Sequence, residues 1–127
     1  MTTTRPIVQL EIEFRYEAAH RLPLVPPGHQ CGRMHGHSYH LTVVVDGPVD
    51  DIGFVCDFAE IKDIAGTLVK QLDHQCLNDI AGLENPTVEV QLVWMWRRLV
   101  KSLPARLVEL RLRETANNTA VYRGVES

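Results

Sequence analysis

The stretch Ile7 to His20 reads Ile-Val-Gln-Leu-Glu-Ile-Glu-Phe-Arg-Tyr-Glu-Ala-Ala-His, and it decides the fold. Apolar and polar side chains alternate along it, which is the pattern of a β-strand with one buried face. The buried face falls on the even-numbered residues, and His20 continues that phase past Ala18. The alternation therefore predicts that His20 points toward the buried side of a sheet.

A second alternating stretch, with its buried face on the odd numbers, runs from Tyr39 to Val45 and ends at Gly47-Pro48. His35 and His37 share its odd phase, whereas His40 falls on the opposite face. Residues two apart in a strand lie on one face. Two neighbouring strands would therefore direct three histidines, including His20, to the same side near one end of the sheet.

Two helices are predicted in the middle of the chain. Asp57 and Glu60 form a capping box that opens the first, which carries apolar residues at helical spacing. Asn85 and Pro86 predict the start of the second, with Asn85 as its N-cap and Pro86 in its first turn. Pro104 is expected to mark the end of this helix.

Two further strands are predicted, over residues 105–115 and 119–123, with Val108, Leu110 and Leu112 on the buried side of the first. The order is β-β-α-α-β-β. This order predicts one α+β domain over residues 1–127, an antiparallel four-stranded sheet with both helices on its apolar face. The polar face fits either a solvated surface or the lining of a barrel closed by several subunits.

Composition excludes several classes of function. The chain has 127 residues and a net charge of −3, so no basic surplus favours nucleic acid as a direct partner. No apolar run approaches the ~20 residues of a membrane helix, and the first residues do not form a secretory signal. The three cysteines, an odd and low number, favour a reducing compartment, and we expect a cytoplasmic protein.

The three histidines point to zinc. Catalytic zinc sites use three protein ligands and leave a fourth position for water or substrate. The spacing His-x14-His-x-His of His20, His35 and His37 is not a common structural finger pattern, and no cysteine pairs complete a closed site. The alternative is that each histidine only packs and forms hydrogen bonds.

Two further groups are candidates for moving protons. Cys31 lies in a turn-rich loop close to His35 and Arg33, and a thiol beside a metal and a basic residue can act as a base or nucleophile. Asp73 and His74 are adjacent, and a carboxylate can orient and charge an imidazole for acid–base work. The alternatives are an inert loop cysteine and ordinary residues of a helix end.

Glu114 shares the phase of Leu110 and Leu112, so its strand directs it toward the core side. A buried carboxylate without a partner is costly. Either Glu114 has a structural partner, or it awaits the donors of a ligand. A guanidine-like edge with two N–H groups would pair with it bidentately.

These motifs together resemble the 6-pyruvoyltetrahydropterin synthase family, and most of all its bacterial branch, the 6-carboxytetrahydropterin synthases of queuosine biosynthesis. The resemblance covers about Val8 to Gly124. Val90 departs from it, because many relatives carry Asn there. The matching motifs are Glu17-Ala-Ala-His20, Cys31-Gly-Arg-Met-His35-Gly-His37-Ser-Tyr39, Gly53-Phe-Val-Cys-Asp57-Phe58, Leu72-Asp73-His74-x-x-Leu77-Asn78, Pro86-Thr87-x-Glu89, and Glu114-Thr115 with Tyr122.

The resemblance implies a tunnelling fold, in which several copies close their sheets into a barrel with active sites between subunits. It implies a homo-oligomer, a hexamer built as a dimer of trimers. It also assigns roles to seven residues: Zn²⁺ ligands for His20, His35 and His37, a catalytic thiolate for Cys31, an acid–base pair for Asp73 and His74, and a pterin anchor for Glu114.

The activity implied by the resemblance is a zinc-dependent lyase reaction on a small pterin triphosphate. The bacterial branch converts 7,8-dihydroneopterin triphosphate and water to 6-carboxy-5,6,7,8-tetrahydropterin, acetaldehyde and triphosphate. Two alternatives stay open. One is a 6-pyruvoyltetrahydropterin synthase, which retains the side-chain carbons, and the other is a non-catalytic protein that binds zinc or a pterin.

Overall fold

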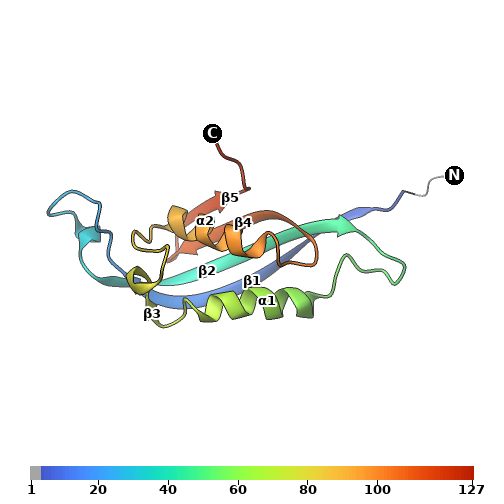
Figure 1. Ribbon diagram of the computed structural model, residues 1–127, viewed down its shortest axis with the longest axis horizontal. Coiled ribbons are helices and arrows are strands. Elements are labelled where there is room, and N and C mark those ends of the chain that lie inside the picture. The colour runs from blue at the N-terminus through green and yellow to red at the C-terminus, as the bar shows by residue number, and fades with distance from the viewer. Residues whose placement is uncertain (1–3) are drawn as a thin grey trace.

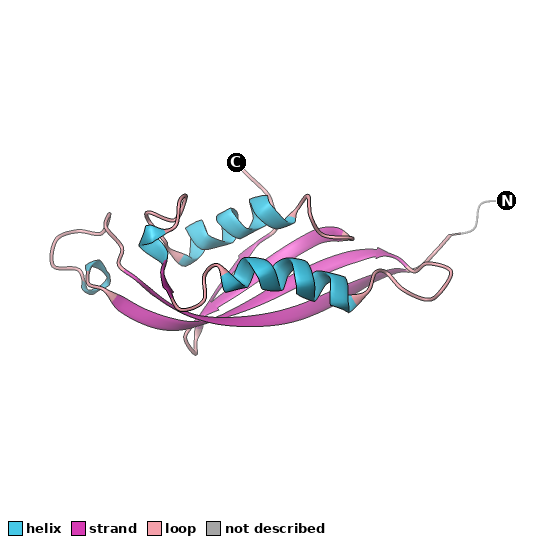
Figure 2. Ribbon diagram, turned by 60° about the horizontal axis from the view of Figure 1, so that its bottom comes forward, coloured by secondary structure: helices cyan, strands magenta, loops and turns pink. Residues whose placement is uncertain are grey.

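A computed structural model of the chain describes residues 4–127 and confirms an α+β domain (Figure 1). Both helices lie on one face of a long twisted sheet, as predicted (Figure 2). The elements in chain order are β1 (Ile7–His20), the short 3₁₀ helix η1 (Gln30–Gly32), β2 (His35–Pro48), α1 (Phe58–Lys70), β3 (Gln75–Cys76), the short 3₁₀ helix η2 (Leu77–Asp79), α2 (Val88–Leu99), β4 (Arg106–Glu114) and β5 (Asn118–Tyr122).

The sheet has five strands in the order β3-β1-β2-β4-β5, rather than the predicted four. The four predicted strands pair antiparallel, and the additional strand β3 pairs parallel with Ala18 and Ala19 of β1. β3 has two residues, which is too short for an alternating pattern to reveal it. It forms because the chain leaving α1 passes the end of β1, where the His74 N–H donates to the Glu17 carbonyl at 2.6 Å.

The pairing of β1 with β2 sets the position of the histidines. His20 lies opposite His35, and Ala18 lies opposite His37. One step further along, the rings of Tyr16 and Tyr39 stack with their centroids 4.8 Å apart, and both side chains are buried beneath the helices. The core therefore ends at the histidines, which occupy the last cross-strand pairs of its face.

The predicted start of α1 is confirmed, because the Asp57 carboxylate accepts from the Ala59 N–H at 2.8 Å. The predicted N-cap of α2 is wrong. This helix begins at Val88, and Thr87 is its N-cap, with its hydroxyl accepting from the Val90 N–H at 3.1 Å. The Pro86 carbonyl accepts instead from side chains in the core, so the chain turns before the helix begins. The helix ends at Leu99, ahead of Pro104.

In β4 the predicted phase needs one correction. An irregularity in the β2–β4 pairing sets Val44 opposite Glu109 but Val45 opposite Leu107. A β-bulge of this kind places two residues of one strand against one of the other and shifts the alternation. Leu107 therefore joins Leu110 and Leu112 in the core in place of Val108, and the phase beyond the bulge is as predicted.

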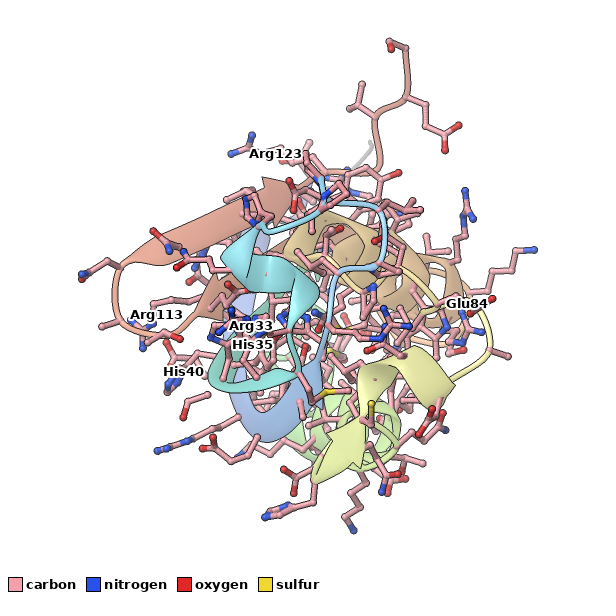
Figure 3. All side chains as sticks on the ribbon, turned by 90° about the vertical axis from the view of Figure 1, so that its left-hand side faces the viewer. Arg33, His35, His40, Glu84, Arg113 and Arg123 are labelled. Carbon is pink, nitrogen blue, oxygen red and sulfur yellow. The ribbon has the colours of Figure 1, made fainter. Side chains whose placement is uncertain are left out.

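The sheet face opposite the helices is polar. Arg111 forms ion pairs with Glu11 and Glu109, and Arg123 reaches Glu109 at 2.9 Å. Figure 3 shows Arg113 on this face, away from the helices. A lining role in a multi-subunit barrel stays a prediction for this face. Among residues 4–127, none of the helices has the length and apolar content needed to span a membrane.

Candidate metal centre and adjoining cavity

The three predicted ligands meet at one end of the sheet. The ligand nitrogens of His20, His35 and His37 all lie within 4.8 Å of one another, and the Nε2 atoms of His20 and His35 are 2.9 Å apart. The rings pack edge to face, with centroids 4.5 to 5.2 Å apart. The alternation of β1 and β2 and their antiparallel register are sufficient to produce this convergence.

Each ring is held through its other nitrogen. His20 Nδ1 lies 2.8 Å from the Pro86 carbonyl oxygen, and His35 Nδ1 lies 2.6 Å from the Arg33 carbonyl oxygen. His37 Nδ1 lies 2.8 Å from the hydroxyl of Thr115. Partners of this kind fix the tautomer and orientation of a metal-binding histidine.

These contacts show that the site fits a cation. A carbonyl oxygen can only accept, so His20 and His35 carry their protons on Nδ1, and their Nε2 lone pairs face each other. The Nε2 of His37 is buried and has no hydrogen-bond partner among the described residues. A metal ion would resolve both features. Three neutral imidazoles are one donor set of catalytic zinc sites, although imidazole also suits copper, iron and nickel.

Burial keeps His20 and His37 in the neutral form that binds metal. The His20 side chain is 1% exposed, and burial lowers its pKa, with His35 and His37 acting in the same direction. Burial also lowers the pKa of His37, against the opposing effect of the Glu114 carboxylate. A metal binds the neutral imidazole, so this environment favours the ligand state near neutral pH.

Glu114 ends β4 with its carboxylate beside this centre. Its Oε1 lies 3.5 Å from His37 Nε2, and its side chain is 22% exposed. Within residues 4–127, His37 is its ion-pair partner, and no arginine or lysine neutralises it. The carboxylate thus lies on the core side, as predicted, with hydrogen-bonding capacity left for a ligand.

Asp73 and His74 form the predicted pair. Asp73 Oδ2 lies 3.0 Å from His74 Nδ1, and Asp73 Oδ1 accepts from the Glu17 N–H at 2.9 Å. The Glu17 N–H and then His74 lower the pKa of Asp73, which keeps it ionised. His74 has a φ of 59°, a left-handed backbone that is uncommon for a residue with a side chain. The turn presents the imidazole outward, with 78% of the side chain exposed.

A cavity of about 630 Å³ is lined by His74 of this pair and by His37 of the metal centre. It opens between the end of β1–β2 and the edge strand β3, so it brings His37 and His74 to one space. Its lining consists of Glu17, Ala18, Ala19, Gly36, His37, Ser38, His74, Gln75, Cys76 and Thr115.

The predicted thiol is not part of this lining. Cys31 lies in η1, half-buried, and its hydrogen bonds among the described residues come from its backbone, to His29 and Leu22. Its catalytic role stays a prediction. Two residues at the site were not predicted. The sequence places Thr115 in a motif but gives no sign that its hydroxyl holds His37, and Cys76 reaches the cavity only through the unpredicted strand β3.

Comparisons with known proteins agree with this architecture. Residues 9–125 match the family model described as 6-pyruvoyl tetrahydropterin synthase. The chain is 37% identical to a 6-carboxy-5,6,7,8-tetrahydropterin synthase of Synechocystis over 87% of this chain and 88% of that one. It is also 37% identical to a dihydroneopterin monophosphate aldolase of Pyrococcus furiosus, over 70% and 72% of the two chains.

The structure of a Caenorhabditis elegans 6-pyruvoyl tetrahydropterin synthase superposes with a TM-score of 0.89 at 26% identity, covering 98% of this chain and 100% of that one. The domain therefore has the tunnelling fold of these enzymes. The chain belongs to the 6-pyruvoyl tetrahydropterin synthase family.

Proposed function

We propose that this protein is a zinc-dependent carbon–carbon lyase. Its reaction converts 7,8-dihydroneopterin triphosphate and water to 6-carboxy-5,6,7,8-tetrahydropterin, acetaldehyde and triphosphate, in queuosine biosynthesis. The observation that carries the proposal is the convergence of a ligand nitrogen from each of three histidines, one of which, His37, lines a cavity together with His74. The identity with the Synechocystis relative supports the choice of product.

His20, His35 and His37 would hold the metal. Bound zinc would act as a Lewis acid and would stabilise negative charge on an oxygen of the substrate side chain. The rings themselves are held in place by Pro86, Arg33 and Thr115, so the ligand set needs little reorganisation.

Of the remaining residues, one binds the substrate and the others transfer protons. Glu114 accepts from two N–H groups of the pterin ring, which fixes the ring relative to the metal. His74, oriented by Asp73, donates or relays a proton across the cavity. Cys31 removes a proton from the substrate side chain, in the role that the family resemblance gives it. Near-normal turnover by a Cys31→Ala variant would remove Cys31 from the mechanism.

We further propose that the protein works as a cytoplasmic homo-oligomer, a hexamer built as a dimer of trimers. The polar face that carries Glu11, Glu109 and Arg111 would then line the barrel. Light scattering coupled to gel filtration measures the mass of the particle, and a monomer would contradict this part of the proposal.

The decisive test is product analysis. Zinc-loaded protein is incubated with 7,8-dihydroneopterin triphosphate, the pterins are identified by mass spectrometry and acetaldehyde is trapped. We expect a 6-carboxy product and acetaldehyde, both lost when a chelator is added. A 6-pyruvoyl product without acetaldehyde would make the protein a 6-pyruvoyltetrahydropterin synthase. Binding without turnover would indicate a non-catalytic protein. The monophosphate ester is tested in parallel because of the P. furiosus relative.

A further inference from the structure

One segment of this acidic chain contains no acidic residue. Between Glu17 and Asp46 the sequence has neither Asp nor Glu, although the chain as a whole carries 16 of them against 13 Lys and Arg. The segment holds Arg21 and Arg33, and five of the six histidines. It forms the end of β1, the loop after it and most of β2. The loop that adjoins the metal centre therefore carries two arginines and no carboxylate of its own.

The loop between β1 and β2 encloses a separate concavity of about 260 Å³. Arg21, His29 and Arg33 line it together with prolines and small residues of the loop. Neither guanidinium forms an ion pair among residues 4–127. His29 Nδ1 accepts from the Cys31 N–H at 3.0 Å, so a neutral His29 carries its proton on Nε2 and can donate it.

The backbone beside both arginines is fixed. The Asn78 side chain accepts from the Arg21 N–H at 3.0 Å and donates to the Arg21 carbonyl at 2.8 Å. The Arg33 carbonyl lies 2.6 Å from His35 Nδ1. Across the loop, the Leu22 N–H donates to the Cys31 carbonyl at 2.8 Å. The loop therefore presents its donors from a framework that needs little ordering when a ligand binds.

The same contacts place the concavity next to the metal centre. Arg21 follows the ligand His20 directly, and Arg33 touches the ligand His35 through its carbonyl. Figure 3, which looks at this end of the molecule, shows Arg33 beside His35. If the side chain of a substrate reached the metal, the group at the far end of that side chain would lie near these donors.

We propose that Arg21, His29 and Arg33 form the subsite for the triphosphate group of the pterin substrate. Guanidinium groups bind phosphate oxygens with two parallel N–H donors, which suits a multiply charged, flexible tail. The proposal rests on the proposed function, because it assigns a place to a substituent of that substrate.

The test compares two ligands that differ only in the tail. Binding of 7,8-dihydroneopterin triphosphate and of 7,8-dihydroneopterin is measured by pterin fluorescence with the zinc-loaded protein. We expect the wild type to prefer the triphosphate ester. Arg21→Ala and Arg33→Ala should each reduce that preference by about tenfold to a hundredfold, the usual effect of losing a charge-assisted hydrogen bond. Affinity for dihydroneopterin should stay unchanged in both.

Arg97→Ala is the matched control, because it removes the same charge from an exposed position on α2, away from the loop. An equal loss of preference in this variant would show that the effect comes from the net charge of the protein, and it would overturn the subsite. Unchanged preference in Arg21→Ala and Arg33→Ala, or no preference in the wild type, would also overturn it. If the wild type binds neither pterin, the proposed function fails as well. If it binds both pterins without preferring the triphosphate ester, only the subsite fails, so the two failures are distinguishable.

Discussion

The metal centre and the Asp73–His74 pair are built in different ways on either side of one cavity. The three histidines extend the apolar face of two long strands, and each has a partner on Nδ1. The pair lies on a turn at the sheet edge, where 78% of the His74 side chain is exposed, whereas His20 is buried. The rigid side suits a group that must stay in place, and the open side suits groups that exchange protons.

The largest effect on activity is expected when one of the three histidines of the metal centre is removed. His35→Ala removes one of three ligands, so we expect loss of bound zinc and of turnover, beyond the hundredfold that outer contacts of a metal site typically contribute. Metal content after dialysis, measured by mass spectrometry, checks this. His40→Ala, on the opposite sheet face, is the control and should retain its zinc. Full turnover of a zinc-free His35→Ala protein would contradict the metal role.

On the other side of the cavity, Asp73→Asn should separate turnover from metal binding. It removes the charge that orients His74 but keeps the size of the side chain. We expect kcat to fall by about a hundredfold to ten-thousandfold, the usual contribution of general acid–base catalysis. Zinc content should stay at the wild-type value. Loss of zinc along with turnover would show that the two regions are not independent.

Glu114→Gln should act on substrate affinity, because it turns a carboxylate into a group with a single acceptor oxygen. We expect dihydroneopterin to bind about tenfold to a hundredfold more weakly, which fluorescence titration measures. Its zinc affinity serves as the internal reference and should change little, since Glu114 lies 3.5 Å from His37 rather than on a ligand position. Unchanged pterin affinity would remove Glu114 as the ring anchor.

A smaller effect is expected at Thr115, whose hydroxyl holds His37. Thr115→Val keeps the shape and the left-handed backbone, with its φ of 59°, but removes the oxygen. Zinc affinity should fall about tenfold, the lower end for such outer contacts, in a competition titration with a chromophoric chelator. Thr115→Ser restores the hydroxyl and should recover the affinity. Equal affinities in the three proteins would rule out this contact.

The smallest effect concerns the stability of the metal-free protein. Burial lowers the pKa of His20 and His37 below the ordinary value of 6.5, so the unfolded state binds more protons below that pH. The free energy of unfolding should be at its full value above pH 6.5 and decrease as the pH falls through the lowered pKa values, with a slope of up to about 1.4 kcal/mol per pH unit and proton. Urea unfolding between pH 7.5 and about 4.5 checks this, and the difference between wild type and His20→Ala isolates the histidine from the carboxylates.

The sequence was informative where side chains repeat with a regular period. The alternation of β1 and β2 predicts which face each histidine occupies, and the phase of β4 beyond Leu110 places Glu114 on the same face. Long strands have one solution for burying their apolar residues, so these predictions do not depend on distant parts of the chain.

Features that depend on contacts between distant segments could not be predicted. The N-cap of α2 moves to Thr87 because the Pro86 carbonyl is used by His20, which lies far away in sequence. β3 exists only because α1 ends beside β1. The place of Cys31 relative to the cavity depends on the path of an irregular loop, for which residue patterns give no register.

The account rests on a metal held by three imidazoles of one chain, and X-ray absorption at the zinc edge tests this most directly. We predict one zinc per chain, with three imidazole nitrogens at about 2.0–2.1 Å and no sulfur ligand. In His37→Ala the imidazole signal should drop to two rings or the metal should be lost. A protein that takes up no zinc, or a spectrum in which the Cys31 or Cys76 sulfur replaces an imidazole, would contradict the account.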